Sequence, residues 1–464
     1  MLEGVRVSVA VTGLQSSEEA AAAEGAVLSF RPLFVALIDT NAWNFQALSF
    51  TENQIARYVN NIYGGEVELV TTDNHGGRSF TWSARDGRKA FALVRDGLIF
   101  FGNDEAAIDR SVTLLNGAGE SITVNEKVGS LPTNALASGY VSREGIGQLA
   151  NIAGVSLAIG SGDDGAVRNF VSRIVPEITR YTATEATWIA RAADEGRIED
   201  LYTIFLEPET ARVLAESVSP APAGESELSR FVPLELISAT RYNLSDPQIA
   251  WRGILMTART KTDAVTGSLL TAFSSVLFSP FGIDDEEVFL KAAASEIQTV
   301  RLDEEGDEVA VILRPKDFEA LRRAIASEIP LTSAPEKFEN ADIWRSANNE
   351  LAAARFEDIL IIGQAKAVEK CLAARNSGRN SSELLKAAGL SVSSSAIFSY
   401  NSDADDLAGL VPRLSGSSNT ADRLPPRFYT VESSFNARGL ERRTISDFGL
   451  VGSLVSRSIS ENKE

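Results

Sequence analysis

Short runs of alternating or continuous apolar residues, separated by turn-forming residues, organise the N-terminal part of the chain. The runs that predict β-strands are Val5–Val11, Leu33–Ile38, Val67–Thr71, Phe80–Ala84, Lys89–Val94 and Leu98–Phe101. The last four are joined by Asn74-His75-Gly76-Gly77, Asp86-Gly87 and Asp96-Gly97, which are typical of tight hairpin turns. Strands joined in this way must be antiparallel, so the pattern predicts a meander and not the parallel sheet of a dinucleotide-binding fold.

Two helices are predicted to flank this meander. Thr51 and Gln54 form a capping box at the start of the first helix, and Gly64 ends it. The apolar face of this helix consists of Ile55, Tyr58, Val59 and Ile62. The second helix spans Asp104–Leu115. The chain is therefore expected to belong to the α+β class, with a mixed, mainly antiparallel sheet and packed helices.

The same pattern returns later in the chain. Residues 89–116 resemble residues 350–376, so that Leu98–Phe101 aligns with Ile359–Ile362 and Gly102 with Gly363. The further matching segments are 32–40 with 307–315, 138–152 with 397–411, and 187–205 with 434–452. A period this long indicates two tandem copies of one α+β unit, and not a solenoid of short repeats.

The duplication predicts the domain organisation. We expect a first repeat at residues 1–216, a linker rich in Pro, Ser, Gly and Ala at 217–230, and a second repeat at 231–464. The second repeat carries a strand–helix extension at 231–306, whereas the first begins near Val5–Val11, the equivalent of Ile297–Leu302. We therefore expect that the first repeat lacks its N-terminal segment, and that a signal peptide or anchor would be missing with it.

Composition narrows the classes of function. The chain has 464 residues, and 63 acidic against 44 basic side chains give a net charge of −19, which disfavours nucleic acid and anionic membrane surfaces. One cysteine and one histidine exclude an internal disulfide, a thiolate zinc cluster and any site that needs two histidines. No apolar stretch approaches the ~20 residues of a spanning helix, and the N-terminus does not resemble a signal peptide.

A glycine pattern at residues 160–165 resembles a dinucleotide-binding fingerprint. Gly160, Gly162 and Gly165 have the spacing G-x-G-x-x-G. However, Asp163 and Asp164 lie where the phosphates of a ligand would bind, and their charge opposes an anion. The equivalent segment of the second copy, 409–426, keeps no such glycines. We therefore interpret the stretch as a connector with an acidic helix start, and expect no cofactor.

Two single residues are candidates for catalysis. His75 could act as a general base beside Asp73, but it lies in a predicted turn and has no counterpart in the second copy. Cys371 could be a nucleophile, but helical spacing puts it on a buried face, where Ser111 is its counterpart. We therefore interpret His75 as a turn residue and Cys371 as a small core residue, and assign no catalytic group.

Acidic clusters suggest calcium at first sight. Residues 401–412 begin like an EF-hand loop, with ligand types at Asn401, Asp403 and Asp405. The sixth position is Asp406 in place of glycine and the twelfth is Pro412 in place of glutamate, so the loop fails at two essential positions. Asp403 with Asp406 is better explained as a helix cap, and Asp284–Glu287 as the acidic first turn of another helix. No metal site is predicted.

The aromatic and broadly apolar segments are interpreted as core. Trp82 lies near the place of Trp344, and Trp188 aligns with Phe435, which favours core packing over a carbohydrate platform. The predicted helix Asp263–Leu277 has a wide apolar face. We expect the sheet to cover that face; if it does not, the helix would offer a surface to a partner or membrane.

Three stretches and the duplicated layout resemble a known family: residues 281–302, 308–317 and 97–112. They resemble an uncharacterised family of bacterial envelope-associated proteins, a domain of unknown function familiar from cyanobacteria and acidobacteria. The resemblance covers residues 231–455 loosely and the first copy in part. It implies α+β repeats behind an export signal or anchor, and a periplasmic or extracellular location, with a cytoplasmic location as the alternative. It brings no catalytic residues.

Two hypotheses for function follow. The first is a non-enzymatic binding or structural protein that contacts another protein or associates with itself. The second is an enzyme or small-ligand protein with a carboxylate-lined cleft between the two repeats, since domain interfaces favour pockets. A deep cleft lined by perturbed Asp or Glu side chains would favour the second, and exposed apolar surface elsewhere would favour the first.

Overall fold

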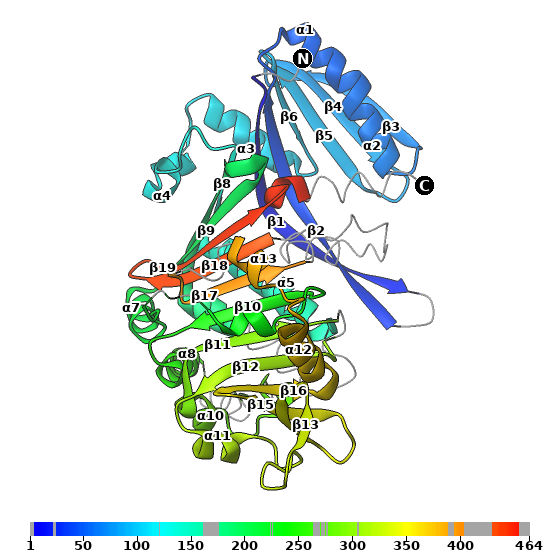
Figure 1. Cartoon of the computed structure of the whole chain (residues 1–464). Coiled ribbons are helices and arrows are strands. Elements are labelled where there is room, and N and C mark those ends of the chain that lie inside the picture. The colour runs from blue at the N-terminus through cyan, green and yellow to red at the C-terminus, as the bar shows by residue number, and fades with distance from the viewer. Residues whose placement is uncertain are drawn as a thin grey trace. The chain divides into compact units, whose positions relative to one another are not determined.

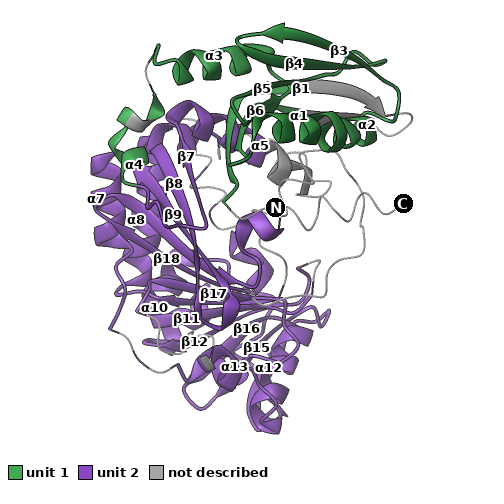
Figure 2. Ribbon diagram, turned by 90° about the horizontal axis from the view of Figure 1, so that it is seen from above, with its two compact units in different colours: residues 1–130, 414–417 green, residues 131–413, 418–464 purple. Residues whose placement is uncertain are grey.

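The chain is α+β, as the sequence predicts, and its computed structural model contains two antiparallel sheets with packed helices (Figure 1). The structure describes residues 4–21, 25–119, 121–160, 176–222, 226–262, 277–303, 306–387, 394–402 and 429–453, with Gly224, Leu270 and Ser274. Two compact units are present, the first within residues 1–130 and the second from residue 131 onward (Figure 2).

The first unit is built on a six-stranded sheet with the order β1-β2-β6-β5-β4-β3. Its strands are β1 (Arg6–Ala21), β2 (Gly25–Asp39), β3 (Val67–Asn74), β4 (Gly77–Ala84), β5 (Lys89–Arg95) and β6 (Leu98–Gly102). All neighbours pair antiparallel, which confirms the predicted meander. Two of its turns have positive φ at both central residues, His75-Gly76 and Asp96-Gly97, as two-residue hairpin turns require.

Helices pack on both faces of this sheet. On one face lies a continuous helical segment of α1 (Asn44–Phe50), a π-helical turn (Thr51–Ile55) and α2 (Ala56–Ile62); α3 (Glu105–Leu115) lies on the other. The predicted cap at Thr51 is wrong. The Trp43 N–H donates to Gln46 Oε1 (3.1 Å) at the true start, and the Thr51 hydroxyl donates to the carbonyl of Ala47 inside the helix (3.0 Å).

The second unit is built on a thirteen-stranded antiparallel sheet with the order β13-β14-β15-β16-β12-β11-β10-β17-β18-β19-β9-β8-β7. Its strands are β7 (Ala137–Val141), β8 (Ala183–Ala192), β9 (Ile198–Leu206), β10 (Ser238–Asn243), β11 (Ala293–Arg301), β12 (Val309–Pro315), β13 (Glu336–Phe338), β14 (Ala341–Arg345), β15 (Leu351–Phe356), β16 (Ile359–Gln364), β17 (Ile397–Asn401), β18 (Tyr429–Asn436) and β19 (Gly439–Ser446). The helices of the unit include α5 (Arg143–Gly160), α7 (Pro208–Ser217), α8 (Pro247–Thr260), α10 (Glu286–Ala292), α11 (Phe318–Ala324), α12 (Ala365–Ser377) and α13 (Ser382–Ala387).

The duplication is visible in strand order and register. The order β11-β12-β16-β15-β14-β13 in the second unit repeats the order β1-β2-β6-β5-β4-β3 of the first. Val35 lies opposite Gly102 between β2 and β6, and Ala310 lies opposite Gly363 between β12 and β16, as the alignment of the two copies requires. The register also makes Val7 of β1 the counterpart of Ile297 of β11.

The units divide the chain near residue 130 and not at the expected linker 217–230. The strands β7–β9, which belong to the first sequence repeat, complete the sheet of the second unit, because β9 pairs with β19 from Phe205–Gly439 to Ile198–Ser446. Described parts of the expected linker are buried, since Val218 and Leu228 are each 2% exposed. Leu228 lies in a short 3₁₀ helix (Leu228–Phe231) that packs into the main core.

Some of the tryptophans are core residues, and others are not. Trp82 is 1% exposed and stacks on Phe80, and Trp344 is 9% exposed. The strand pairing places Trp344 at the counterpart of Phe80, since each lies opposite equivalent alanines of the next strand. Trp188 donates from Nε1 to buried Asp200 (2.8 Å). Trp43 differs from these, because 76% of its surface is exposed.

Candidate functional site

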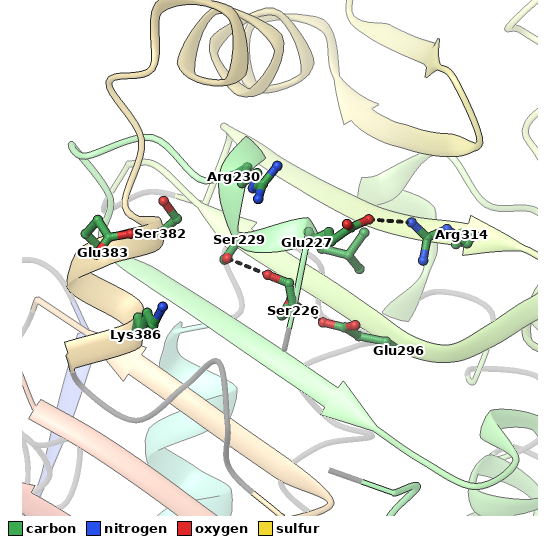
Figure 3. A pocket seen from close by; sticks show the side chains of 10 residues that line it. Ser226, Glu227, Ser229, Arg230, Glu296, Arg314, Ser382, Glu383 and Lys386 are labelled. Atoms are coloured by element: carbon green, nitrogen blue, oxygen red, sulfur yellow. Dashed lines mark hydrogen bonds and ion pairs between the residues drawn. The ribbon is translucent and has the colours of Figure 1, made fainter. Parts of the chain in front are cut away.

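A polar pocket of about 270 Å³ lies on one face of the second unit's sheet (Figure 3). It is lined by Ser226, Glu227, Leu228, Ser229, Arg230, Glu296, Arg314, Ser382, Glu383 and Lys386. These residues come from the segment around the 3₁₀ helix 228–231, from β11 and β12, and from α13. The pocket therefore belongs to the expected linker and the second repeat, and it is not the carboxylate-lined cleft between the repeats that the sequence suggested as an alternative.

Backbone contacts hold the two rims of the pocket together. The Ser229 hydroxyl donates to the carbonyl of Ser226 (2.9 Å), which tightens the turn on one side. On the other side, the backbone N–H of Ser381 donates to the carbonyl of Val232 (2.7 Å), and the Ser381 hydroxyl donates to Pro233. Ser381 is fully buried, so α13 starts from a fixed point against the 3₁₀ helix.

Two of the three carboxylates that line the pocket, Glu227 and Glu296, are paired with guanidinium groups. Arg314 Nη2 lies 2.9 Å from Glu227 Oε2, and its Nε lies 2.5 Å from Asp358. Burial lowers the pKa of Arg314, but the hydrogen bonds and charges of Glu227 and Asp358 outweigh this and raise it. Arg241, which is 3% exposed, lies 3.2 Å from Glu296, to which Ser226 also donates. Glu227 and Glu296 are therefore held by cations and do not form a free acid–base pair.

A buried amide lies next to this network. Gln298 of β11 is fully buried and lies opposite Arg241 of β10. Its side-chain oxygen and nitrogen both lack a hydrogen-bond partner among the described residues. An unpaired buried amide destabilises a fold by about 1–3 kcal/mol. Gln298 does not line the pocket, so it marks a local weakness of the core and not a ligand contact.

The structure places His75 beside a different carboxylate from the expected one. It lies at positive φ (51°) in the turn between β3 and β4, as the sequence predicts. Its Nε2 lies 3.1 Å from Asp109 Oδ1 on α3, so its partner is Asp109 and not Asp73. Both side chains are substantially exposed. The pair ties a hairpin turn to a helix.

Cys371 and Asp285 behave as the sequence predicts. Cys371 is fully buried in α12, and burial raises the pKa of its thiol to about 12. A thiol in that state is not a nucleophile at neutral pH. Asp285 is the N-cap of α10 and accepts from the backbone N–H of Val288 (2.9 Å), so the acidic cluster at 284–287 is the first turn of a helix.

Three further sequence features lie wholly or largely outside the described residues. Gly160 ends α5, but positions 161–175, with the remaining glycines and aspartates of the fingerprint, are not described. Of the EF-hand-like loop only Asn401 and Ser402 are described. Of the predicted helix 263–277, only Leu270, Ser274 and Leu277 are described. These interpretations therefore stay predictions.

Exposed apolar side chains gather in the first unit. Val7, Val9 and Val11 of β1 are each about three-fifths exposed, at 60%, 62% and 60%. Trp43 and Phe45, at the start of α1, are 76% and 68% exposed. The sequence predicted a strand at Val5–Val11, but alternation alone does not tell whether a strand lies inside a sheet or at its edge. Neither this surface nor the polar pocket was predicted.

Comparisons with protein-family models, curated proteins and solved structures found no match for this chain. Within the part of the chain that the structure describes, no three His, Cys, Asp or Glu side chains lie together as metal ligands would. The helices of that part include none with the length and apolar character needed to cross a membrane.

Proposed function

We propose that this chain is a non-enzymatic protein that acts through protein–protein contacts made by its first unit. The observation that carries the proposal is the exposure of large apolar side chains there, above all Val7, Val9, Val11, Trp43 and Phe45. Val7, Val9 and Val11 lie on one face of β1 by strand alternation, and an exposed apolar patch on a folded unit is typical of an interaction site. The paired charges of the polar pocket supply no comparable support for catalysis.

The two copies of the repeat sharpen this argument. Val7 is 60% exposed, whereas its counterpart in the second copy, Ile297, is 6% exposed. The second copy covers this position with its own neighbouring elements, α10 among them. The first copy keeps the apolar residue and leaves it uncovered, which is the state expected of a surface that a protein partner covers.

We further propose that this contact is made at the cell envelope. The support is the resemblance of residues 231–455 and 97–112 to envelope-associated proteins. Fractionation of the producing cells tests the location: recovery of the protein from the cytoplasmic fraction alone would contradict it.

A photo-crosslinking amino acid at position 43 tests the contact itself. In the cells that produce the protein, the substitution of Trp43 by benzoylphenylalanine should give, on illumination, a covalent adduct with a protein. The matched control replaces Ile249 on α8 of the second unit, which is 54% exposed and also apolar. Adducts at both positions, or at neither, would contradict an interaction site located in the first unit.

A further inference from the structure

The outer edge of β1 differs from the same edge in the second copy. In the second copy, β11 pairs with β12 on one side and with β10 on the other, from Ser238–Arg301 to Asn243–Glu296. In the first copy, β1 pairs with β2 and no described strand lies on its other side. At the opposite edges, β3 and β13 have no further neighbour among the described strands in either copy. β7 likewise ends its sheet, whereas its counterpart β17 pairs with β10, so among the described residues β1 and β7 each lack the neighbour that β10 provides in the second copy.

The backbone groups that point outward along this edge belong to the three valines. The Asn103 N–H donates to the Phe34 carbonyl (3.2 Å), and the Phe34 N–H donates to Asn103 Oδ1 (2.9 Å), so Phe34 bonds toward β6. Its partner in β1, Val11, is then a non-hydrogen-bonded residue of the β1–β2 ladder. By alternation, Val7, Val9 and Val11 all point their N–H and C=O groups away from β2.

The chemistry of this edge suits pairing. Natural edge strands are usually blocked by lysine, proline or bulges. From Val7 to Val11 the strand contains only valine, serine and alanine, and the first register shift comes between Val11 and Gly13. The segment is thus regular, uncharged and apolar on one face. Exposed β-branched side chains stabilise antiparallel pairs when they lie opposite one another.

We propose that a second copy of this chain covers the edge, so that β1 pairs antiparallel with β1 of its partner about a two-fold axis at Val9. This inference rests on the proposed function and names its partner. Val9 would lie opposite Val9, and Val7 opposite Val11, which joins the two six-stranded sheets into one. The segment Val-Ser-Val-Ala-Val is nearly the same in both directions, which makes it self-complementary across such an axis.

The second unit already shows this mode of pairing. β9 and β19 are the last strands of the two sequence repeats, and they pair antiparallel with each other along their length. Equivalent edges of the repeat thus meet within one chain in the geometry proposed for β1 between chains. A two-fold contact is also closed, so it yields a dimer and not a fibre.

The first test is sedimentation of the whole chain and of Val9→Pro. Proline at position 9 removes an outward N–H and leaves the β1–β2 ladder intact, as edge strands tolerate. We expect a dimer for the unaltered chain and at least a tenfold rise, about 1.4 kcal/mol, in the dimer dissociation constant of Val9→Pro. A monomeric unaltered chain, or a Val9→Pro dimer of unchanged affinity, would overturn the proposal.

The matched control is Thr71→Pro on the opposite edge of the same sheet. The two-residue turn at His75-Gly76 makes Asn74 and Gly77 a hydrogen-bonded pair, so the N–H of Thr71 points outward by alternation. Thr71→Pro should leave the dimer unchanged. Equal loss of the dimer in both proline variants would show that the effect comes from damage to the sheet and would overturn the assignment to β1.

A cysteine at position 9 tests the register independently of folding. Directly paired residues of an antiparallel pair have Cα atoms about 5.5 Å apart, within the range of a disulfide. The only native cysteine, Cys371, is fully buried, so mild oxidation of Val9→Cys should give a covalent dimer and Thr71→Cys should not. A dimer that fails to cross-link through position 9 uses another surface, which would overturn this inference while the crosslink at Trp43 still tests the proposed function.

Discussion

The sheet of the first unit and the matching part of the second unit are two outcomes of one sequence pattern. Both have six strands in the same order and the same register around a glycine. They differ in their neighbours: β11 lies inside a thirteen-stranded sheet, whereas β1 ends its sheet. The exposure of Val7 and of its counterpart Ile297, 60% against 6%, follows from the elements that surround each strand and not from the repeat itself.

The two copies share a glycine at the same position, Gly102 in the first and Gly363 in the second, where the backbone of the neighbouring strand lies very close. A Cβ atom at Gly102 would lie 2.1 Å from the carbonyl oxygen of Phe34, and at Gly363 it would lie 2.2 Å from that of Val309. Gly363 also has a φ of +153°, which side chains rarely adopt. Both glycines let one strand turn into the following helix while its backbone stays in close contact with the neighbouring strand.

Alanine at either glycine should therefore have the largest effect. We expect Gly102→Ala and Gly363→Ala each to lower the free energy of unfolding by about 3 kcal/mol, because backbone must move to admit the methyl group. Hydrogen exchange read by mass spectrometry should show the loss in β1–β6 for Gly102→Ala and in β11–β16 for Gly363→Ala.

Gly147→Ala is the control for these variants. Gly147 lies in α5, and a Cβ atom at this position would have no neighbouring atom within 4 Å beyond the backbone of its own helix. Alanine there should raise the free energy of unfolding by up to about 1 kcal/mol. If all three alanines had similar effects, the close approach would not be the reason that both copies keep glycine.

The strands of the repeat unit could be predicted from local sequence, whereas the assembly of the second unit's sheet depends on pairing between distant segments. Alternation and short turns sufficed for β3–β6, because each strand pairs with its neighbour in the chain. The pairing of β9 with β19 joins segments more than two hundred residues apart, and no local sequence pattern predicts it. For the same reason, the segment 217–230 resembled a linker in composition although Leu228 is buried in the core.

The candidate sites show the same limit. Cys371 and Asp285 could be interpreted from helical spacing and capping, since both depend on residues within one turn. The polar pocket combines residues 226–230 with β11, β12 and α13, so its members are scattered in sequence. The edge of β1 could not be predicted, because the spacing of apolar residues within a strand does not show whether another strand lies beside it.

Gln298 marks a difference between the two copies, and its substitution should have an effect of intermediate size on the free energy of unfolding. Its counterpart in β1 is Ser8, which is exposed, whereas Gln298 is fully buried with an unpaired amide. Gln298→Met keeps the length of the side chain and removes the unpaired groups, so it should raise the free energy of unfolding by about 1–2 kcal/mol. Ser8→Met should change it by less than about 0.5 kcal/mol. Denaturant titration of both variants measures this, and a destabilised Gln298→Met would mean that the amide has a partner in solution.

Substitutions in the β-turns before β4 and β14 should give the smallest change in stability. His75 (φ 51°) and Glu339 (φ 49°) each occupy the first position of a two-residue turn, where asparagine adopts positive φ more readily. Glu339→Asn loses the contact of the Glu339 carboxylate with Asn376 (2.9 Å), and His75→Asn loses the contact with Asp109. Because exposed contacts contribute little, each variant should change stability by no more than about 0.5 kcal/mol in thermal unfolding. A loss above about 1 kcal/mol in His75→Asn alone would give the His75–Asp109 pair a role that the second copy does without.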